Sequence, residues 1–283
     1  MDEVNEIIET NSTGLTESEE ALLAATLAEV HGELEDTLPT NSKSLLIDES
    51  TSRFSSAEWF EKVKEQQVTL AGLGGIGSYV AFLLGRLKIN RLILWDDDTV
   101  DMTNLSGQFY SREYIGNSKV SSIAEMLREY SGYYSYITNE CKFSVTSPAT
   151  DIMICGFDNM VARNVFYNVW KDHVTRIPER DSSKCLFIDG RLAAEEFQVF
   201  CIKGDDDFLM KKYENEWLFS DDEAEATLCS YKQTSFCANM IASVMVNLFV
   251  NFIANQCNPL IERELPFYTS YDAERMYFKT EQV

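Results

Sequence analysis

A glycine-rich segment at residues 72–77 has the residue types and the spacing of a nucleotide-binding loop. Gly72, Gly74 and Gly77 follow the apolar run 68–71 and open a helical pattern. There the first glycine permits a tight turn, the second lets the backbone approach a phosphate, and the third lets the helix pack on the strand. The first N–H groups of the helix attract the anion. Asp96, 24 residues after Gly72, ends the next apolar run, where its carboxylate could bind both ribose hydroxyls.

This context alone predicts a dinucleotide site, for which an NAD-dependent oxidoreductase is the default hypothesis. The structural alternative is that the glycines bind no ligand and serve only to pack the helix on the strand. A dehydrogenase also needs an acid or base beside its substrate. The two histidines, His31 and His173, are not placed to supply one, and the polar residues after Asp96 would have no role.

Four polar motifs follow one another from residue 96 to residue 159. They read Asp-Asp-Asp-Thr-Val at 96–100, Asn-Leu-Ser-Gly-Gln at 104–108, Gly-Asn-Ser-Lys-Val at 116–120 and Cys-Gly-Phe-Asp-Asn at 155–159. This ordered set resembles the ThiF/MoeB/HesA family, the ubiquitin-activating-type adenylyltransferases, over about residues 53–255. The wording of the motifs looks like a phage-encoded branch of that family.

The resemblance implies an ATP-dependent adenylyltransferase that activates the C-terminal carboxylate of a small ubiquitin-like or sulfur-carrier protein ending in Gly. An acyl-adenylate forms and pyrophosphate leaves, with ATP and Mg²⁺ as the cofactors. The implied catalytic residues are Lys119 on the phosphates, Asp158 on Mg²⁺ and Cys229 as a thiol acceptor. The implied nucleotide-binding residues are Gly72, Gly74, Gly75, Gly77, Asp96, Asp98, Asn104, Gln108, Lys119, Asp158 and Asn159.

Each of these roles has a structural alternative. Lys119 could be a surface lysine at the start of a helix, and Asp158 could be the N-cap of the helix that passes through Val161. Cys229 precedes a long apolar helix and could form a thioester or serve packing alone. Lys232 favours a reactive thiolate there, whereas the acidic run 221–225 raises the pKa of the thiol.

The sequence departs from the family pattern at Gly107. The family has arginine there, and a guanidinium that clamps phosphate cannot be replaced by a hydrogen atom. Arg112 of the same chain, or Arg53 of a second subunit, could compensate. The departure also permits another reading, in which the chain is the non-catalytic half of a heterodimeric activating enzyme.

The elements that must position these residues alternate as in βαβ units. Strands are expected at 68–71, 91–95, 134–143, 151–155, 185–189 and 197–202, and edge strands within 265–278. Helices are expected at 79–87, 119–130, 161–169 and 236–253, and an acidic loop at 205–227. The fold class is therefore α/β, a doubly wound Rossmann-like, mostly parallel sheet with an antiparallel extension in which 197–202 is the first partner strand.

Composition and residue patterns divide the chain into three segments. Residues 1–52 carry 13 acidic side chains and one basic, and an amphipathic helix is expected after the capping pattern at 16–19. We therefore predict an acidic arm at 1–52, an adenylation domain at 53–255 and C-terminal strands at 256–283 that complete the sheet. The long helix at 236–253 predicts a homodimer, because it offers more apolar surface than one small domain needs.

Composition also excludes some classes of protein. A net charge of −22 argues against nucleic acid as the main partner, and no uninterrupted apolar run is long enough for a membrane span. The seven cysteines contain no Cys-x-x-Cys pair, so we expect no structural zinc and no disulfide framework. Five of them, Cys141, Cys155, Cys185, Cys201 and Cys237, lie in apolar runs typical of buried thiols. The expected location is the cytoplasm, that of the host if a phage encodes the chain.

Overall fold

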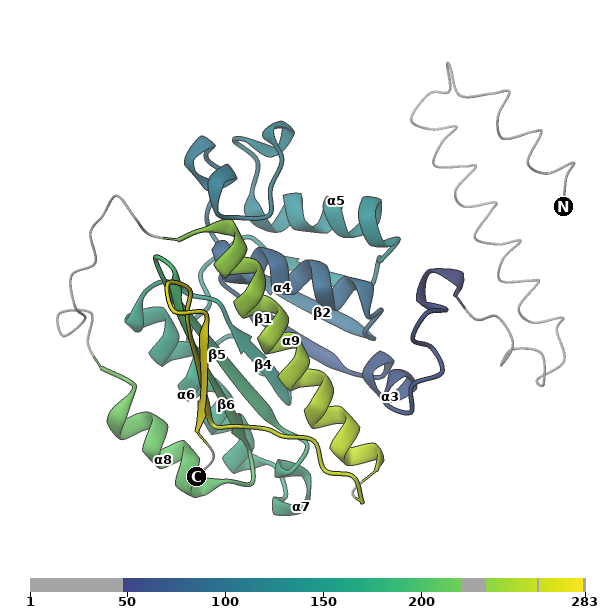
Figure 1. The fold of residues 1–283 in the computed structure, drawn as a ribbon, viewed down its shortest axis with the longest axis vertical. Coiled ribbons are helices and arrows are strands. Elements are labelled where there is room, and N and C mark those ends of the chain that lie inside the picture. Colours follow the sequence, from purple (N-terminus) through teal and green to yellow (C-terminus); the bar gives the residue numbers. More distant parts are fainter. Residues whose placement is uncertain (1–47, 220–232, 259, 282–283) are drawn as a thin grey trace, which may run out of the picture. The chain divides into compact units, whose positions relative to one another are not determined.

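A computed structural model describes residues 48–219, 233–258 and 260–281 (Figure 1). The chain divides into two compact units, Met1–Ser52 and Arg53–Val283. In the first unit, the described residues include a 3-10 helix, η2, at Glu49–Thr51. The helix expected after residue 16 lies outside the described residues, so the acidic arm stays a prediction.

The second unit is built on one sheet of eight strands in the order β3-β2-β1-β4-β5-β6-β7-β8. The strands are β1 (Gln67–Ala71), β2 (Arg91–Trp95), β3 (Tyr136–Asn139), β4 (Ile152–Cys155), β5 (Leu186–Ala193), β6 (Glu196–Lys203), β7 (Tyr268–Asp272) and β8 (Tyr277–Glu281). The first five run parallel, and each later strand is antiparallel to the strand before it. The predicted fold class is confirmed.

Helices cover both faces of this sheet (Figure 1). They are α3 (Phe60–Lys64), α4 (Gly75–Arg86), α5 (Lys119–Ser131), α6 (Met160–Arg176), α7 (Glu179–Ser182), α8 (Asp207–Glu216) and α9 (Ser235–Cys257), with the 3-10 helices η3 (Met102–Ser106) and η4 (Arg112–Tyr114). Alternation along the strands sorts the core: Ile152 and Ile154 join the cluster with α4, α5 and α9, whereas Met153 and Cys155 join the cluster with α6 and α8.

Helix α9 is the central helix of the first cluster. Twelve of its residues are buried, and it packs on α4 and on the strands β5 and β6. Counted by length and composition, α9 could cross a membrane, with a hydropathy of 1.8 over its most apolar window. Scattered Ser and Asn residues interrupt its apolar residues, so the sequence shows no uninterrupted run, and a buried core helix of this length passes the same test. Since α9 already buries about half of its residues within this chain, its length does not by itself argue for a dimer.

The prediction of a loop over residues 205–227 was wrong for its first half, which forms α8. Asp206 caps this helix, because its carboxylate accepts a hydrogen bond from the Leu209 amide at 2.9 Å. Met210 and Tyr213, three residues apart, are buried on one side. Acidic residues masked this short amphipathic pattern.

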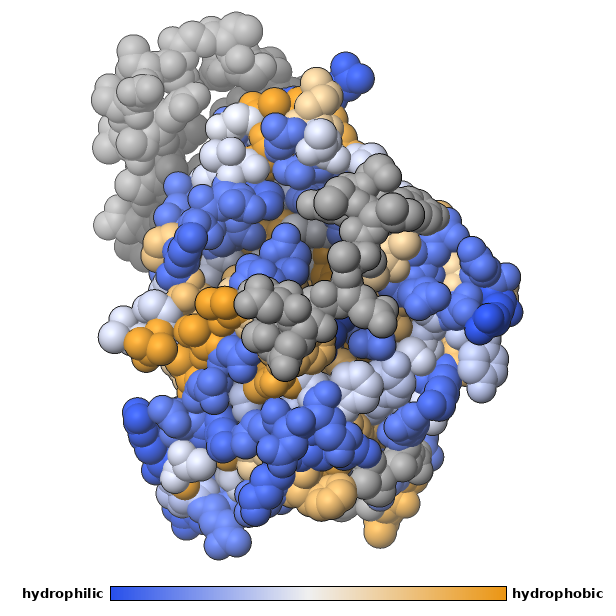
Figure 2. Space-filling model, turned by 90° about the vertical axis from the view of Figure 1, so that its left-hand side faces the viewer, coloured by the Kyte–Doolittle hydropathy of each residue, from blue (hydrophilic) through white to orange (hydrophobic). Residues whose placement is uncertain are grey.

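Hydrophilic residues predominate over the face in Figure 2, where hydrophobic residues form separate patches.

The strand predicted at 134–143 is also shorter than expected. Only residues 136–139 pair with β2, at the edge of the sheet. Past this strand, the chain turns so that the ring of Phe143 lies 5.2 Å from that of Trp95. Cys141 consequently is exposed, against the prediction, whereas the other four thiols expected in apolar runs are buried.

Candidate nucleotide site

The candidate site lies at the carboxyl ends of β1, β2 and β4. Strand order reverses at β1, since β2 lies on one side of it and β4 on the other. In doubly wound sheets such a reversal opens a crevice that binds ligands. The loops after these three strands carry the glycine-rich segment, Asp96 and Asp158.

Two glycines let the loop after β1 touch the loop after β4. Gly72 has a φ of +82°, and a Cβ at this position would lie 2.7 Å from the backbone nitrogen of Phe157. From the other loop, a Cβ on Gly156 would lie 2.6 Å from the carbonyl oxygen of Gly72. Asp158 follows Phe157 directly, so the structure brings its backbone next to the glycine-rich loop.

We expect Gly72→Ala to destabilise the protein more than Gly116→Ala. Both positions have a positive φ, +82° and +90°, but no atom lies within 4 Å of a Cβ on Gly116. Gly116→Ala should therefore lose only the backbone term, about 1–2 kcal/mol of unfolding free energy. Gly72→Ala adds a clash with backbone and should lose about 2 kcal/mol more. Urea unfolding measures both, and equal losses would contradict the close approach of the two loops.

Asp96 is tied to the glycine-rich loop. Its Oδ2 accepts a hydrogen bond from the Leu73 amide at 2.6 Å, and its Oδ1 accepts one from the Asp98 amide at 2.8 Å. Burial raises the pKa of this carboxyl, while Lys119 and the two amides lower it. Each oxygen retains a second lone pair, which could accept a hydroxyl of a ribose.

Lys119 is the first residue of α5, and the alternative that it is a surface lysine was wrong. The residue is 6% exposed, and its Nζ donates to Oδ2 of Asp98 at 2.8 Å. It therefore places one buried positive charge among the carboxylates that follow β2. A phosphate group entering the crevice would compete with Asp98 for this ammonium group.

Asn104 lies in η3, and Gln108 follows two residues after its end. Oδ1 of Asn104 accepts a hydrogen bond from the Asp101 amide at 2.9 Å, as part of a capping box. The Gln108 side chain faces the loop, with Nε2 3.9 Å from a Cβ built on Gly74. Its Oε1 is buried and has no hydrogen-bond partner among the described residues. Because such a group costs about 1–3 kcal/mol, a polar ligand in the crevice would fit the site.

The structure rules out Asp158 as the N-cap of α6. The cap is Asn159, whose Oδ1 accepts a hydrogen bond from the Ala162 amide at 2.8 Å. Asp158 is exposed, and its Oδ1 accepts a hydrogen bond from Nδ2 of Asn159 at 3.3 Å. An exposed carboxylate beside a phosphate site has the donor type that Mg²⁺ takes.

Buried polar residues that motif reasoning did not assign hold these loops. Tyr110 donates a hydrogen bond from its hydroxyl to the Leu73 carbonyl at 2.7 Å. Arg163 is 3% exposed and donates to the Phe157 carbonyl and to Asp189, a fully buried carboxylate. Arg163 lies in α6 and Asp189 in β5, 26 residues apart, so no local spacing reveals the pair.

Gln233 occupies the space beside Gly107. A Cβ on Gly107 would lie 2.9 Å from its Cγ, and a Cβ on Gly75 would lie 2.1 Å from its Oε1. The side chain thus covers the first turn of α4, where a phosphate would be expected. Arg53 and Arg112, the two candidates to replace the missing arginine, are both exposed. Cys229 lies outside the described residues, so its role stays a prediction.

The family model of ThiF matches residues 48–283, and the chain therefore belongs to the ThiF family. Among curated relatives, the Ubiquitin-like modifier-activating enzyme 5 of Bombyx mori is 32% identical over an alignment of 120 residues that covers 37% of this chain and 30% of that protein. The enzyme of the same name from Arabidopsis thaliana is 34% identical over 77 residues, 27% of this chain and 18% of that protein. The chain thus spans less than a third of the length of these relatives.

Two solved structures share the fold over nearly the whole chain. PaaA superimposes with a TM-score of 0.64 at 18% identity, covering 97% of this chain and 85% of its own. E. coli MccB, in a structure with ATP, superimposes with a TM-score of 0.58 at 17% identity, covering 95% of this chain and 80% of its own. Identities this low establish the shared fold alone.

Proposed function

We propose that this protein is an ATP-dependent adenylyltransferase that activates the C-terminal carboxylate of a small ubiquitin-like or sulfur-carrier protein ending in Gly. The observation that carries the proposal is the convergence of the glycine-rich loop, Asp96 and Asp158 at the carboxyl ends of β1, β2 and β4. Support comes from the relatives named as modifier-activating enzymes and from MccB, solved with ATP and with MccA.

In the proposed reaction a carboxylate oxygen attacks the α-phosphorus of ATP. The bond to the β-phosphate oxygen breaks, and pyrophosphate leaves with the electron pair. Asp96 binds the ribose, and Lys119 neutralises charge that builds up on the phosphates. Nε2 of Gln108, on the side of Gly74, would donate a hydrogen bond to a phosphate oxygen, and its buried Oε1 would accept one from a donor such as a ribose hydroxyl. Asp158 would hold Mg²⁺, which neutralises the phosphate oxygens when it is bound.

Exchange of radiolabelled pyrophosphate into ATP tests this proposal directly. The purified chain is assayed with ATP, Mg²⁺ and candidate proteins or peptides that end in Gly. Exchange that depends on the acyl substrate supports the proposal. Tight binding of NADH without any exchange would overturn it in favour of a dehydrogenase.

A second candidate, the non-catalytic half of a heterodimer, is favoured by the contact between Gly107 and Gln233. If Gln233 blocks the phosphate position permanently, the chain should bind ATP weakly and exchange no pyrophosphate. If Gln233 only fills space until ATP binds, Gln233→Ala should preserve exchange. Calorimetric ATP titration and the exchange assay on this variant separate the two.

The same contact predicts that the effect of an arginine at position 107 on ATP affinity depends on the side chain at position 233. Gly107→Arg alone should weaken ATP binding, because its Cβ meets Cγ of Gln233. In the Gln233→Ala background the arginine has room for a charge-assisted bond to phosphate, so ATP affinity should rise about tenfold or more above that of Gln233→Ala. A double-mutant cycle measures the coupling. Additive effects would contradict this account.

A homodimer also remains part of the proposal, as a prediction from family resemblance. Sedimentation at micromolar concentration should give twice the chain mass of 32.3 kDa. A monomer would contradict it without affecting the adenylation chemistry assigned to a single chain.

A further inference from the structure

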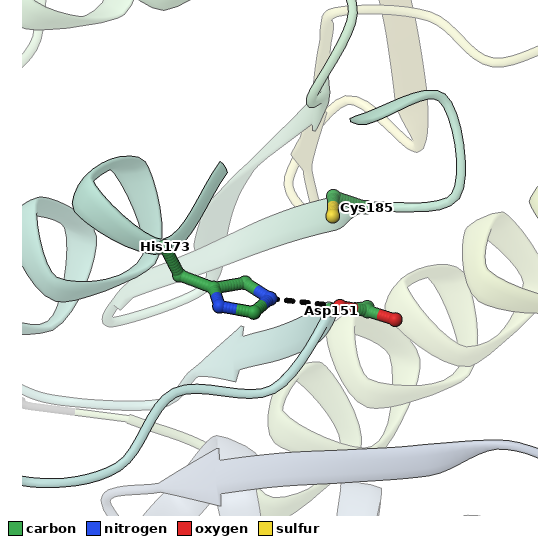
Figure 3. Close-up of side chains that lie close together, drawn as sticks. All are labelled: Asp151, His173 and Cys185. Atoms are coloured by element: carbon green, nitrogen blue, oxygen red, sulfur yellow. Dashed lines mark hydrogen bonds and ion pairs between the residues drawn. The ribbon is translucent and has the colours of Figure 1, made fainter. Parts of the chain in front are cut away.

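Three side chains with metal-binding atoms converge at the other end of the sheet (Figure 3). Asp151 immediately precedes β4, Cys185 immediately precedes β5, and His173 lies in the last turn of α6. Their ligand atoms lie within 4.8 Å of one another. Asp151 and Gly156 flank the two ends of β4, so this cluster is separate from the candidate nucleotide site.

The backbone holds the three residues in place. The Leu186 amide donates to the Asp151 carbonyl at 2.9 Å, and Nε1 of Trp170 donates to the same oxygen at 3.1 Å. The Gly204 amide donates to the Cys185 carbonyl at 2.9 Å. The cluster therefore joins α6 to the starts of two adjacent strands, and little rearrangement is needed to bring the ligand atoms to one ion.

The three side chains differ in how far they are exposed to solvent. The side chain of Asp151 is 58% exposed, that of His173 is 27% exposed, and Cys185 is fully buried. Nε2 of His173 lies 2.7 Å from Oδ1 of Asp151. Asp151 and His173 are thus the ligands that an ion would meet first, and the buried sulfur would be the innermost ligand.

We propose that Asp151, His173 and Cys185 bind one divalent ion of the Zn²⁺ type, with water as the fourth ligand. Sulfur, imidazole nitrogen and carboxylate oxygen form the donor set that Zn²⁺ accepts, whereas Mg²⁺ and Ca²⁺ take oxygen alone. The thiol releases its proton to solvent as the sulfur–metal bond forms. The site departs from the zinc expectation of the sequence, which considered only local cysteine pairs.

A Cys-His-Asp nucleophile is the competing reading of the same residues. Burial and the carboxylates of Asp151, Asp181 and Asp205 raise the pKa of the Cys185 thiol to about 12. A neutral thiol with no exposed surface cannot attack a substrate at neutral pH. The same carboxylates provide the negative potential that attracts a cation.

Cobalt substitution tests the site on the full chain, since Co²⁺ occupies zinc sites and a thiolate ligand gives it an intense charge-transfer absorption. After treatment with a chelator, titration with CoCl₂ should reach one ion per chain with this absorption, and added ZnCl₂ should abolish it. The His173→Gln and Asp151→Asn variants should each bind Co²⁺ about 100-fold more weakly or worse. Cys201→Ser, which removes another buried thiol that belongs to the other core cluster, should bind like the wild type.

Cys185→Ser should lose the charge-transfer absorption. If this variant fails to fold, His173→Gln and Asp151→Asn decide, because they change more exposed side chains. Zinc should also raise the midpoint of thermal unfolding of the wild type and leave that of His173→Gln unchanged. Absence of the absorption in the wild type, or its persistence in His173→Gln and Asp151→Asn, would overturn the proposal.

Discussion

Replacing Asp158 with alanine should reduce pyrophosphate exchange by about 100-fold or more while leaving the fold intact. The carboxylate is exposed beside the glycine-rich loop, and it is not the cap of α6, because Asn159 performs that function. Its removal therefore costs no helix stability but takes away the oxygen ligand proposed for Mg²⁺. Exchange at saturating ATP and Mg²⁺ measures the loss, and urea unfolding measures the stability.

Asp172→Ala is the matched control for this experiment. Asp172 is an exposed carboxylate within α6, the helix that follows Asp158. Its side chain is 67% exposed, and among the described residues it forms an ion pair with Arg176 alone, at 3.4 Å. It should keep wild-type exchange and lose well under 1 kcal/mol of stability. An Asp158→Ala protein that exchanges pyrophosphate at the wild-type rate would remove both the metal role and the site proposed around it.

Replacing Arg163 with alanine should cost about 3 kcal/mol of unfolding free energy and should also impair exchange. Its guanidinium bonds the buried carboxylate of Asp189 and the carbonyl of Phe157. Asp189 would keep hydrogen bonds from Arg191 at 2.9 Å and Tyr213 at 2.8 Å, which places the loss at the lower end for a broken buried ion pair. The loop before Asp158 would lose its anchor, and exchange should fall.

Two variants sharpen this prediction. Arg163→Lys keeps the charge but cannot reach Asp189 and Phe157 with a fork of donors, so it should lose less stability than alanine and still exchange poorly. Arg176→Ala, on the same helix, removes a surface ion pair and should change stability by less than about 1 kcal/mol. A small loss of stability in Arg163→Ala would mean that the buried pair does not hold the loop.

Local patterns in the sequence are enough to predict the parallel half of the fold. Strands β1, β2 and β4 are short apolar runs, and each is followed directly by a motif of residues that are contiguous in the sequence. Hydrophobic periodicity and composition are properties of a few neighbouring residues, so they can be recognised in the sequence without knowledge of tertiary contacts. The same reasoning missed α8, because its acidic residues obscure the amphipathic pattern. It also predicted too long a strand at β3, because the position of β3 at the edge of the sheet limits how many of its residues pair.

The tertiary structure decided how the motif residues meet. That Lys119 is buried against Asp98, and that Gln233 fills the space beside Gly107, depend on contacts between segments that are apart in the chain. The same holds for Arg163 with Asp189 and for the cluster of Asp151, His173 and Cys185. Sequence spacing alone carries no information on such contacts, because packing between elements far apart in the chain sets their distances, burial and charge.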